Sequence, residues 1–203
     1  MASSGIQLFG FLLAVVGLAA IVTATCMVEW TTFESSEEQA DIYGGLWETC
    51  RASSSRMSCK AHDSFLELPW GIQVTRAVLI SSICLSSLAV LVSIWGMKCT
   101  RFMEDREETK RFMALSGGVM FMISGLLALV VTSWYVGLLI EAYKNAHELD
   151  RYEFGNAAFV SWVGSILSLV GGAFLNCRRC FRTRSSMSPA MIRQSAAGGA
   201  EYV

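Results

Sequence analysis

The residue types best suited to chemistry in this sequence are its seven cysteines and two histidines. His62 and His147 are far apart. The sequence shows no Gly-rich phosphate-binding motif, metal-ligand cluster or nucleophile and base pair. We therefore expect a protein that is not an enzyme and needs no cofactor. Cys50 and Cys59 are close in sequence, and two nearby thiols normally pair in an oxidising compartment. Whether these two pair depends on which side of a membrane they occupy.

Four long apolar segments make up most of the chain. Hydrophobic residues account for 53% of the 203 positions and charged residues for 16%, which is too apolar for an ordinary soluble domain. An unpaired charge at the centre of a bilayer costs at least about 2.5 kcal/mol, and about 20 apolar residues cross the hydrocarbon. The segments without Asp, Glu, Lys or Arg are 8–28, 77–97, 112–140 and 155–176. We predict four transmembrane helices in a left-handed bundle, packed through small residues. The third is longer than a bilayer needs, so it either tilts or continues outside the membrane.

Orientation follows from the basic residues. Most of the 16 lysines and arginines lie in segments 98–111 and 177–203, which the positive-inside rule places in the cytoplasm together with residues 1–7. The first apolar segment lacks a basic start and a cleavage site, so it is predicted to be an uncleaved signal anchor. Segments 29–76 and 141–154 are then extracellular, and a Cys50–Cys59 disulfide is predicted. The cysteines at cytoplasmic helix ends are either palmitoylated or unmodified thiols: Cys99, Cys177 and Cys180.

The first extracellular segment is too long to be a simple turn, so it must have a fold of its own. Residues 41–50 are rich in aromatic and β-favouring types and are followed by a serine-rich stretch, which predicts two antiparallel strands joined as a hairpin. Phe65 and Leu68 are at helical spacing, which predicts a short amphipathic helix on the membrane surface. Phe65 is either a lateral contact for a neighbouring molecule or part of the loop's own core. Trp30 and Trp47 either form an aromatic belt or lock the sheet to the helix ends.

A family pattern is present in these residues. Trp30, the triplet Gly45-Leu46-Trp47, Cys50 and Cys59 resemble the signature of the claudin superfamily. Further stretches resemble claudins proper: Gln73-Val-Thr-Arg76 before the second predicted helix, Trp134-Tyr135, Arg151-Tyr152-Glu153-Phe154-Gly155 before the fourth, and Glu201-Tyr202-Val203 at the end. The chain departs from the pattern in the second extracellular segment. Claudins usually have an aromatic pair followed by Asp-Pro there, whereas this chain has Glu141-Ala-Tyr143-Lys-Asn145. The proline usually found two residues before the signature tryptophan is also absent. The resemblance is therefore to a divergent member.

The resemblance implies a structural protein of tight junctions in the plasma membrane. Its partners would be itself and other claudins, both side by side and between cells, in strands that form a paracellular barrier or a charge-selective pore. Lys60 follows the second signature cysteine, at a position that lines the pore in several claudins, and Arg51 and Arg56 are nearby. A fixed charge at the constriction then favours a barrier that restricts cations. The alternative is that the many acidic residues before Arg76 give a cation preference.

The tail of the chain predicts a scaffold partner, and the wider superfamily offers an alternative function. The tail from residue 177 is predicted to be disordered, with the carboxylate of Val203 suited to the groove of a PDZ scaffold protein. Membrane lipid is an expected partner and nucleic acid is not. The alternative function is that of a superfamily member without junction strands, such as a peripheral myelin protein or an auxiliary subunit of receptors or channels. Such relatives share the signature, but this sequence has no Asn-x-Ser/Thr glycosylation site and ends in Tyr-Val.

Overall fold

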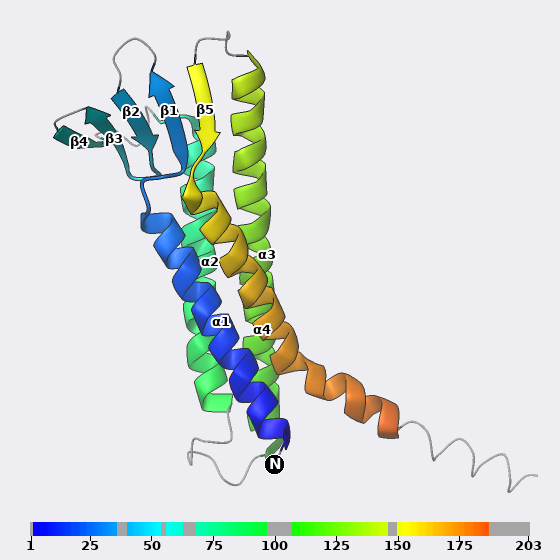
Figure 1. The fold of residues 1–203 in the computed structure, drawn as a ribbon. Coiled ribbons are helices and arrows are strands. Elements are labelled where there is room, and N and C mark those ends of the chain that lie inside the picture. Colours follow the sequence, from blue (N-terminus) through cyan, green and yellow to red (C-terminus); the bar gives the residue numbers. More distant parts are fainter. Residues whose placement is uncertain are drawn as a thin grey trace, which may run out of the picture.

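Four long helices run side by side and carry a small β-sheet at one end (Figure 1). The structure is a computed structural model that describes residues 2–35, 40–53, 56–62, 68–96, 107–145 and 150–186. The helices are α1 Ala2–Cys26, α2 Trp70–Gly96, α3 Glu107–Asn145 and α4 Asn156–Ser186. Each contains a segment long and apolar enough to cross a membrane: Gly5–Cys26, Trp70–Gly96, Phe112–Ala142 and Asn156–Asn176. The predicted four-helix membrane protein is confirmed.

Small and hydroxyl-bearing residues bring the helices together. At the α1–α4 contact, a Cβ added to Gly171 would lie 2.6 Å from the backbone oxygen of Gly10, so only glycine permits this approach. Between α2 and α3, the hydroxyl of Ser82 donates to the carbonyl of Ser124 over 2.9 Å. Between α3 and α4, the hydroxyls of Thr132 and Ser161 are 2.7 Å apart. In hydrocarbon, close backbone packing and interhelical hydrogen bonds supply the attraction that the hydrophobic effect cannot.

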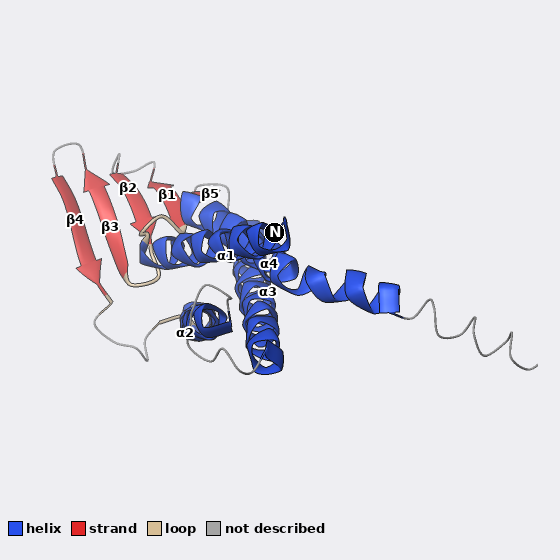
Figure 2. Cartoon of the chain, turned by 90° about the horizontal axis from the view of Figure 1, so that it is seen from below, coloured by secondary structure: helices blue, strands red, loops and turns tan. Residues whose placement is uncertain are grey.

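The sheet has five antiparallel strands in the order β4-β3-β2-β1-β5 (Figure 2). They are β1 Thr31–Ser35, β2 Ala40–Gly44, β3 Glu48–Ser53, β4 Arg56–Ala61 and β5 Asp150–Phe154. The small antiparallel sheet is confirmed, and the predicted hairpin corresponds to β3 with β4. Residues 41–50, predicted to supply its first strand, instead form β2 and the start of β3 with a turn between them. The two-strand prediction was incomplete, because β1 follows α1 directly and β5 comes from the second predicted extracellular segment. The alternation of charged and aromatic residues in Arg151-Tyr152-Glu153-Phe154 is typical of a half-buried strand, but it was not used to predict β5. Its pairing with β1 could not be predicted locally, because β1 lies far away in the sequence.

The second helix begins earlier than predicted, at Trp70 instead of residue 77. The carbonyl of Pro69 accepts from the backbone N–H groups of Ile72 and Gln73 over 3.0 and 3.4 Å, which starts the helix. The predicted boundary followed Arg76 because a charge was not expected within a span. That reasoning failed because Arg76 is buried in protein and not in lipid.

The third and fourth helices are both longer than the predicted spans. α3 extends past residues 112–140 at both ends, from Glu107 to Asn145. α4 continues to Ser186, which corrects the expectation that the tail is disordered from residue 177. Extending a formed helix needs no new nucleation, and 177–186 contains neither glycine nor proline. The predicted short extracellular helix falls largely on residues 63–67, outside the described residues.

Candidate functional site

The predicted disulfide is present. Cys50 on β3 and Cys59 on β4 are directly opposite each other in the register, and their sulfur atoms are bonded. Cys50 is completely buried, and the bond holds β3 and β4 together as a hairpin. Glu48 lies close enough to both sulfurs to suggest a metal site, but sulfurs bonded to each other offer no thiolate ligand. The role of this cluster is therefore structural.

Replacing Cys50 with serine should loosen the hairpin. A cross-link closing a loop of about ten residues contributes roughly 2 to 3 kcal/mol in the chain-entropy model, and the serine hydroxyl would be buried. We expect a fall in thermal midpoint for the purified protein and faster amide exchange in β3 and β4. Cys84→Ser, a change at an exposed helical cysteine, is the matched control and should leave both unchanged. Equal effects of the two substitutions would contradict a stabilising role for the bond.

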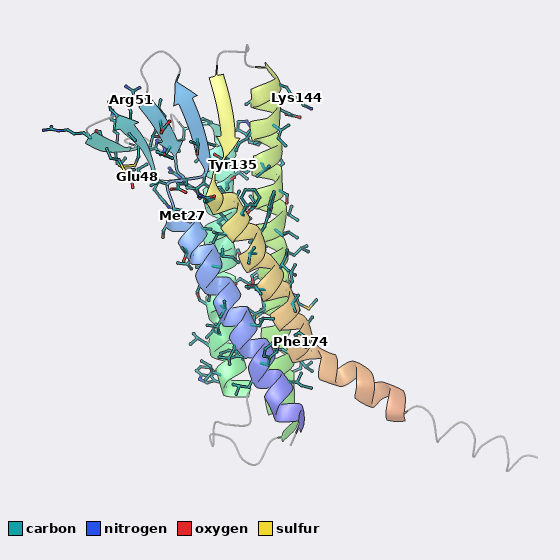
Figure 3. All side chains as sticks on the ribbon, viewed as in Figure 1. Met27, Glu48, Arg51, Tyr135, Lys144 and Phe174 are labelled. Carbon is teal, nitrogen blue, oxygen red and sulfur yellow. A yellow bond between two sulfur atoms is a disulfide. The ribbon has the colours of Figure 1, made fainter. Side chains whose placement is uncertain are left out.

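Trp30 attaches β1 to the helix bundle. Its side chain is 1% exposed, and its indole N–H donates to the carbonyl of Ala24 near the end of α1 over 2.9 Å. The ring meets that of Tyr135 on α3 edge to face at 5.6 Å between centroids. Its backbone N–H donates to Gly44 over 3.0 Å. Figure 3 shows Tyr135 on α3 where the sheet meets the bundle. These contacts favour the locking role for Trp30 over a place in an aromatic belt.

Trp47 and Arg76 form a second attachment, between the β2–β3 turn, α1 and α2. The indole N–H of Trp47 donates to the carbonyl of Thr25 over 2.9 Å, although 43% of the residue is exposed. The guanidinium carbon of Arg76 is 4.9 Å from the Trp47 ring centroid, a cation–π distance. Nε of Arg76 donates to the carbonyl of Leu46 over 2.6 Å, and Nη2 of the same side chain donates to the same oxygen. The hydrogen bond and the cation–π contact favour the locking role for Trp47, although part of its side chain is exposed.

Gly155 joins β5 and α4 to the end of α1. It is buried, and its N–H donates to the carbonyl of Trp30 over 3.3 Å. A Cβ on this residue would overlap the backbone carbonyl of Glu29. That same carbonyl accepts from the N–H of Ala157 over 3.1 Å, and the Glu29 carboxylate accepts from Nδ2 of Asn156 over 3.0 Å. Tyr135 belongs to the Trp134-Tyr135 stretch noted in the sequence, but its contact with Trp30 was not predicted. The contacts of Glu29 and Thr25 were not predicted either, because their partners are distant along the chain.

The register separates charges of opposite sign onto the two faces of the outer strands. Thr49 is opposite Lys60, Arg51 opposite Ser58, and Ser53 opposite Arg56. Because successive strand residues point to opposite faces, the three basic residues share one face: Arg51, Arg56 and Lys60. The acidic residues Asp41 and Glu48 lie on the other face, with Cys50 and Cys59. The three basic residues are exposed.

The remaining predicted sites are spread over the chain. Tyr143 is in the last turns of α3, and Arg151, Tyr152, Glu153 and Phe154 are in β5 beside β1. Cys177 and Cys180 are in α4 beyond its membrane span. Phe65, Cys99, Glu201, Tyr202 and Val203 lie outside the described residues. The described part of the site is thus the five-stranded sheet and its attachments to α1, α2, α3 and α4.

Known proteins resemble this chain along nearly its whole length. The sequence profile of the PMP-22/EMP/MP20/Claudin family matches residues 4–175. Claudin-1 of Rattus norvegicus is 38% identical over 211 aligned positions, which cover 100% of both chains. Claudin-7 of Mus musculus is 40% identical over 185 positions, covering 87% of each chain. Claudin-19 of Homo sapiens is 34% identical over 207 positions, covering 98% of this chain and 92% of that protein. The similarity therefore includes all four helices and the sheet.

Proposed function

Because this chain belongs to the PMP-22/EMP/MP20/claudin family, we propose that it is a structural protein of tight junctions that polymerises into strands and forms a paracellular barrier. Its partners are other copies of itself and other claudins, within one membrane and between cells. Both termini are cytoplasmic in this proposal, which places the sheet outside the cell. It requires no covalent chemistry.

The observation that supports this proposal is the firm attachment of the sheet to the bundle. Trp30 joins β1 to α1 and α3, Arg76 and Trp47 join the β2–β3 turn to α1 and α2, and Gly155 brings β5 onto the end of α1. A sheet fixed at several points loses little conformational entropy when it binds a neighbouring molecule. More of the free energy of the intermolecular contacts is then available to stabilise the assembly. The sheet is therefore suited to repeated association of like molecules.

Expression in fibroblasts that lack claudins tests this function. Freeze-fracture replicas should show continuous intramembrane strands at contacts between expressing cells, and none at contacts with non-expressing cells. Diffuse surface distribution without strands, at normal surface abundance, would instead support the auxiliary or myelin-type alternative. Surface biotinylation measures that abundance.

We propose that the barrier restricts cations and that Lys60 sets this preference. Lys60 shares an exposed face with Arg51 and Arg56, whereas the acidic Asp41 and Glu48 are on the opposite face. In this proposal, the face that carries Lys60 lines the passage between cells. The screening length at physiological salt is about 8 Å, so a charge on that face has more effect on passing ions than the acidic residues on the opposite face. The acidic residues outnumber the basic ones in the first loop as a whole. A simple count of these charges therefore overestimates the influence of the acidic residues on the opposite face.

Lys60→Asp should raise the sodium to chloride permeability ratio at least about twofold in epithelial monolayers that lack other claudins. Dilution potentials measure this ratio. Lys60→Arg keeps the charge and should leave the ratio unchanged. Lys144→Asp makes the same charge reversal at an exposed position near the end of α3, and serves as the control for a general surface effect. An unchanged ratio for Lys60→Asp would refute the assignment.

We propose further that the three last residues, Glu201, Tyr202 and Val203, bind a PDZ scaffold. The free carboxylate and an apolar final side chain fit the groove where a peptide adds a strand to a sheet edge. Val203→Ala should abolish pull-down by a PDZ scaffold while strands still form. Retained pull-down would show that the tail binds through other residues.

A further inference from the structure

One face of the β3–β4 hairpin is built only from basic and hydroxyl-bearing residues. Strand register and the alternation of side chains place six residues on it: Thr49, Arg51, Ser53, Arg56, Ser58 and Lys60. Thr49 is partly buried and the other five are exposed. In Figure 1 and Figure 2, these two strands are at the end of the sheet that projects away from the helix bundle. This surface, the basic face of the hairpin, is open to a partner from outside.

The three positive charges on the basic face are close enough to act together. Arg51 is directly opposite Ser58, and Arg56 and Lys60 are two residues to either side of Ser58 on β4. Diagonal neighbours in an antiparallel pair are about 7 to 8 Å apart, which is within the screening length of about 8 Å at physiological salt. The two strands place no acidic residue on this face, because Glu48 is on the other one. A ligand here therefore meets three positive charges.

The composition of the basic face favours a hydrated polyanion over a folded protein. Protein interfaces usually have an apolar or aromatic centre from which water is excluded, and none of the six residues is apolar or aromatic. Guanidinium groups pair with oxyanions through two parallel hydrogen bonds, and the hydroxyls of Ser and Thr both donate and accept. A sulfated polysaccharide presents anionic groups and sugar hydroxyls along one extended chain. Clustered lysine and arginine are the usual surface for such polymers.

We propose that the basic face of the hairpin binds a sulfated polysaccharide of the cell surface. The biological setting rests on the proposed function, which places the sheet outside the cell, but the binding itself does not require strands. Three charged contacts hold one copy weakly, whereas a polysaccharide that meets several copies along a strand gains avidity without any new contact. Bound sulfate groups would also neutralise Arg51, Arg56 and Lys60, so the polysaccharide would weaken the restriction on cations.

Binding of a fluorescent heparin decasaccharide to the purified full-length protein in phosphatidylcholine nanodiscs tests this proposal. We expect the affinity to be at least about tenfold higher in about 50 mM than in about 200 mM sodium chloride, because charged contacts release bound counterions. Changing Arg51, Arg56 and Lys60 to Gln together should lower the affinity at low salt at least about tenfold. The fully desulfated decasaccharide should not bind. Absence of heparin binding at low salt would overturn the proposal, as would equal binding of the desulfated chain.

Single substitutions keep the test decisive if the triple variant does not fold. Arg51→Gln and Lys144→Gln each remove one exposed positive charge, the first from the basic face and the second from near the end of α3. Arg51→Gln should weaken binding about threefold at low salt, and Lys144→Gln should leave it unchanged. Equal losses for the two variants would contradict a localised site, because binding would then follow net charge alone.

Polyglutamate of matching charge distinguishes a polysaccharide from an acidic protein. It should bind at least about threefold more weakly than the decasaccharide, since the basic face offers a polypeptide nothing apolar to pack against. Equal or tighter binding of polyglutamate would overturn the assignment to a polysaccharide. Each nanodisc holds one copy, so the measurement does not depend on strand assembly. A protein that binds heparin but forms no strands in fibroblasts would contradict the proposed function and leave this inference standing.

Discussion

Gly155→Ala should prevent this protein from reaching the cell surface in a folded form. The added Cβ would overlap the backbone carbonyl of Glu29. That backbone has little freedom to move, because its oxygen accepts the N–H of Ala157 and the next carbonyl, that of Trp30, accepts the N–H of Gly155. Relief of the overlap would separate α4 and β5 from the end of α1. We expect a loss of about 3 kcal/mol or more in the free energy of unfolding.

The measurement combines surface biotinylation in cells with thermal unfolding of purified protein in detergent. Gly137→Ala is the matched control, since a Cβ on Gly137 of α3 would meet nothing within 4 Å. Alanine also has the higher helix propensity, so Gly137→Ala should be neutral or slightly stabilising. Normal surface abundance and an unchanged midpoint for Gly155→Ala would show that the junction of α1, β5 and α4 is not closed as described.

Arg76→Met should have the second largest effect. Methionine keeps much of the length of the side chain but removes both donors to the carbonyl of Leu46 and the cation over Trp47. Arg76 is only 5% exposed and Leu46 is completely buried, so water cannot readily replace the lost donors. An unsatisfied buried carbonyl and a lost charged hydrogen bond together predict a destabilisation of about 2 to 3 kcal/mol.

Thermal unfolding measures this loss, and tryptophan fluorescence reports on the environment of Trp47. Arg56→Met makes the same substitution at an exposed position at the start of β4 and should change the midpoint little. Arg76→Lys should recover only part of the stability, because an ammonium group lacks the planar fork and stacks less well on an aromatic ring. If Arg76→Met unfolds at the same temperature as the unchanged protein, the attachment of the turn to α2 is not what stabilises the sheet.

The four membrane spans and the disulfide, which rest on local composition, were confirmed. A membrane helix is recognised by one continuous apolar segment, so the four spans could be located without knowledge of their neighbours. Cys50 and Cys59 could be paired because both fall in one short stretch between the first two predicted spans. Helix ends were predicted less well. The α2 boundary was placed after Arg76 because the charge was judged against lipid, whereas the side chain is surrounded by protein.

By itself, the sequence determined the membrane class of the protein, its four spans and the hairpin with its disulfide, because each is encoded by neighbouring residues. Only the tertiary structure decided how the sheet is held and how its charges are arranged. β5 pairs with β1 across most of the chain, and Gly155 meets Glu29 through a backbone contact that leaves no pattern in either segment. Strand register assigned Lys60 and Glu48 to opposite faces, and a shift of one residue would have reversed that assignment. Contacts between distant segments and strand register are properties of the assembled chain, and local residue patterns do not specify them.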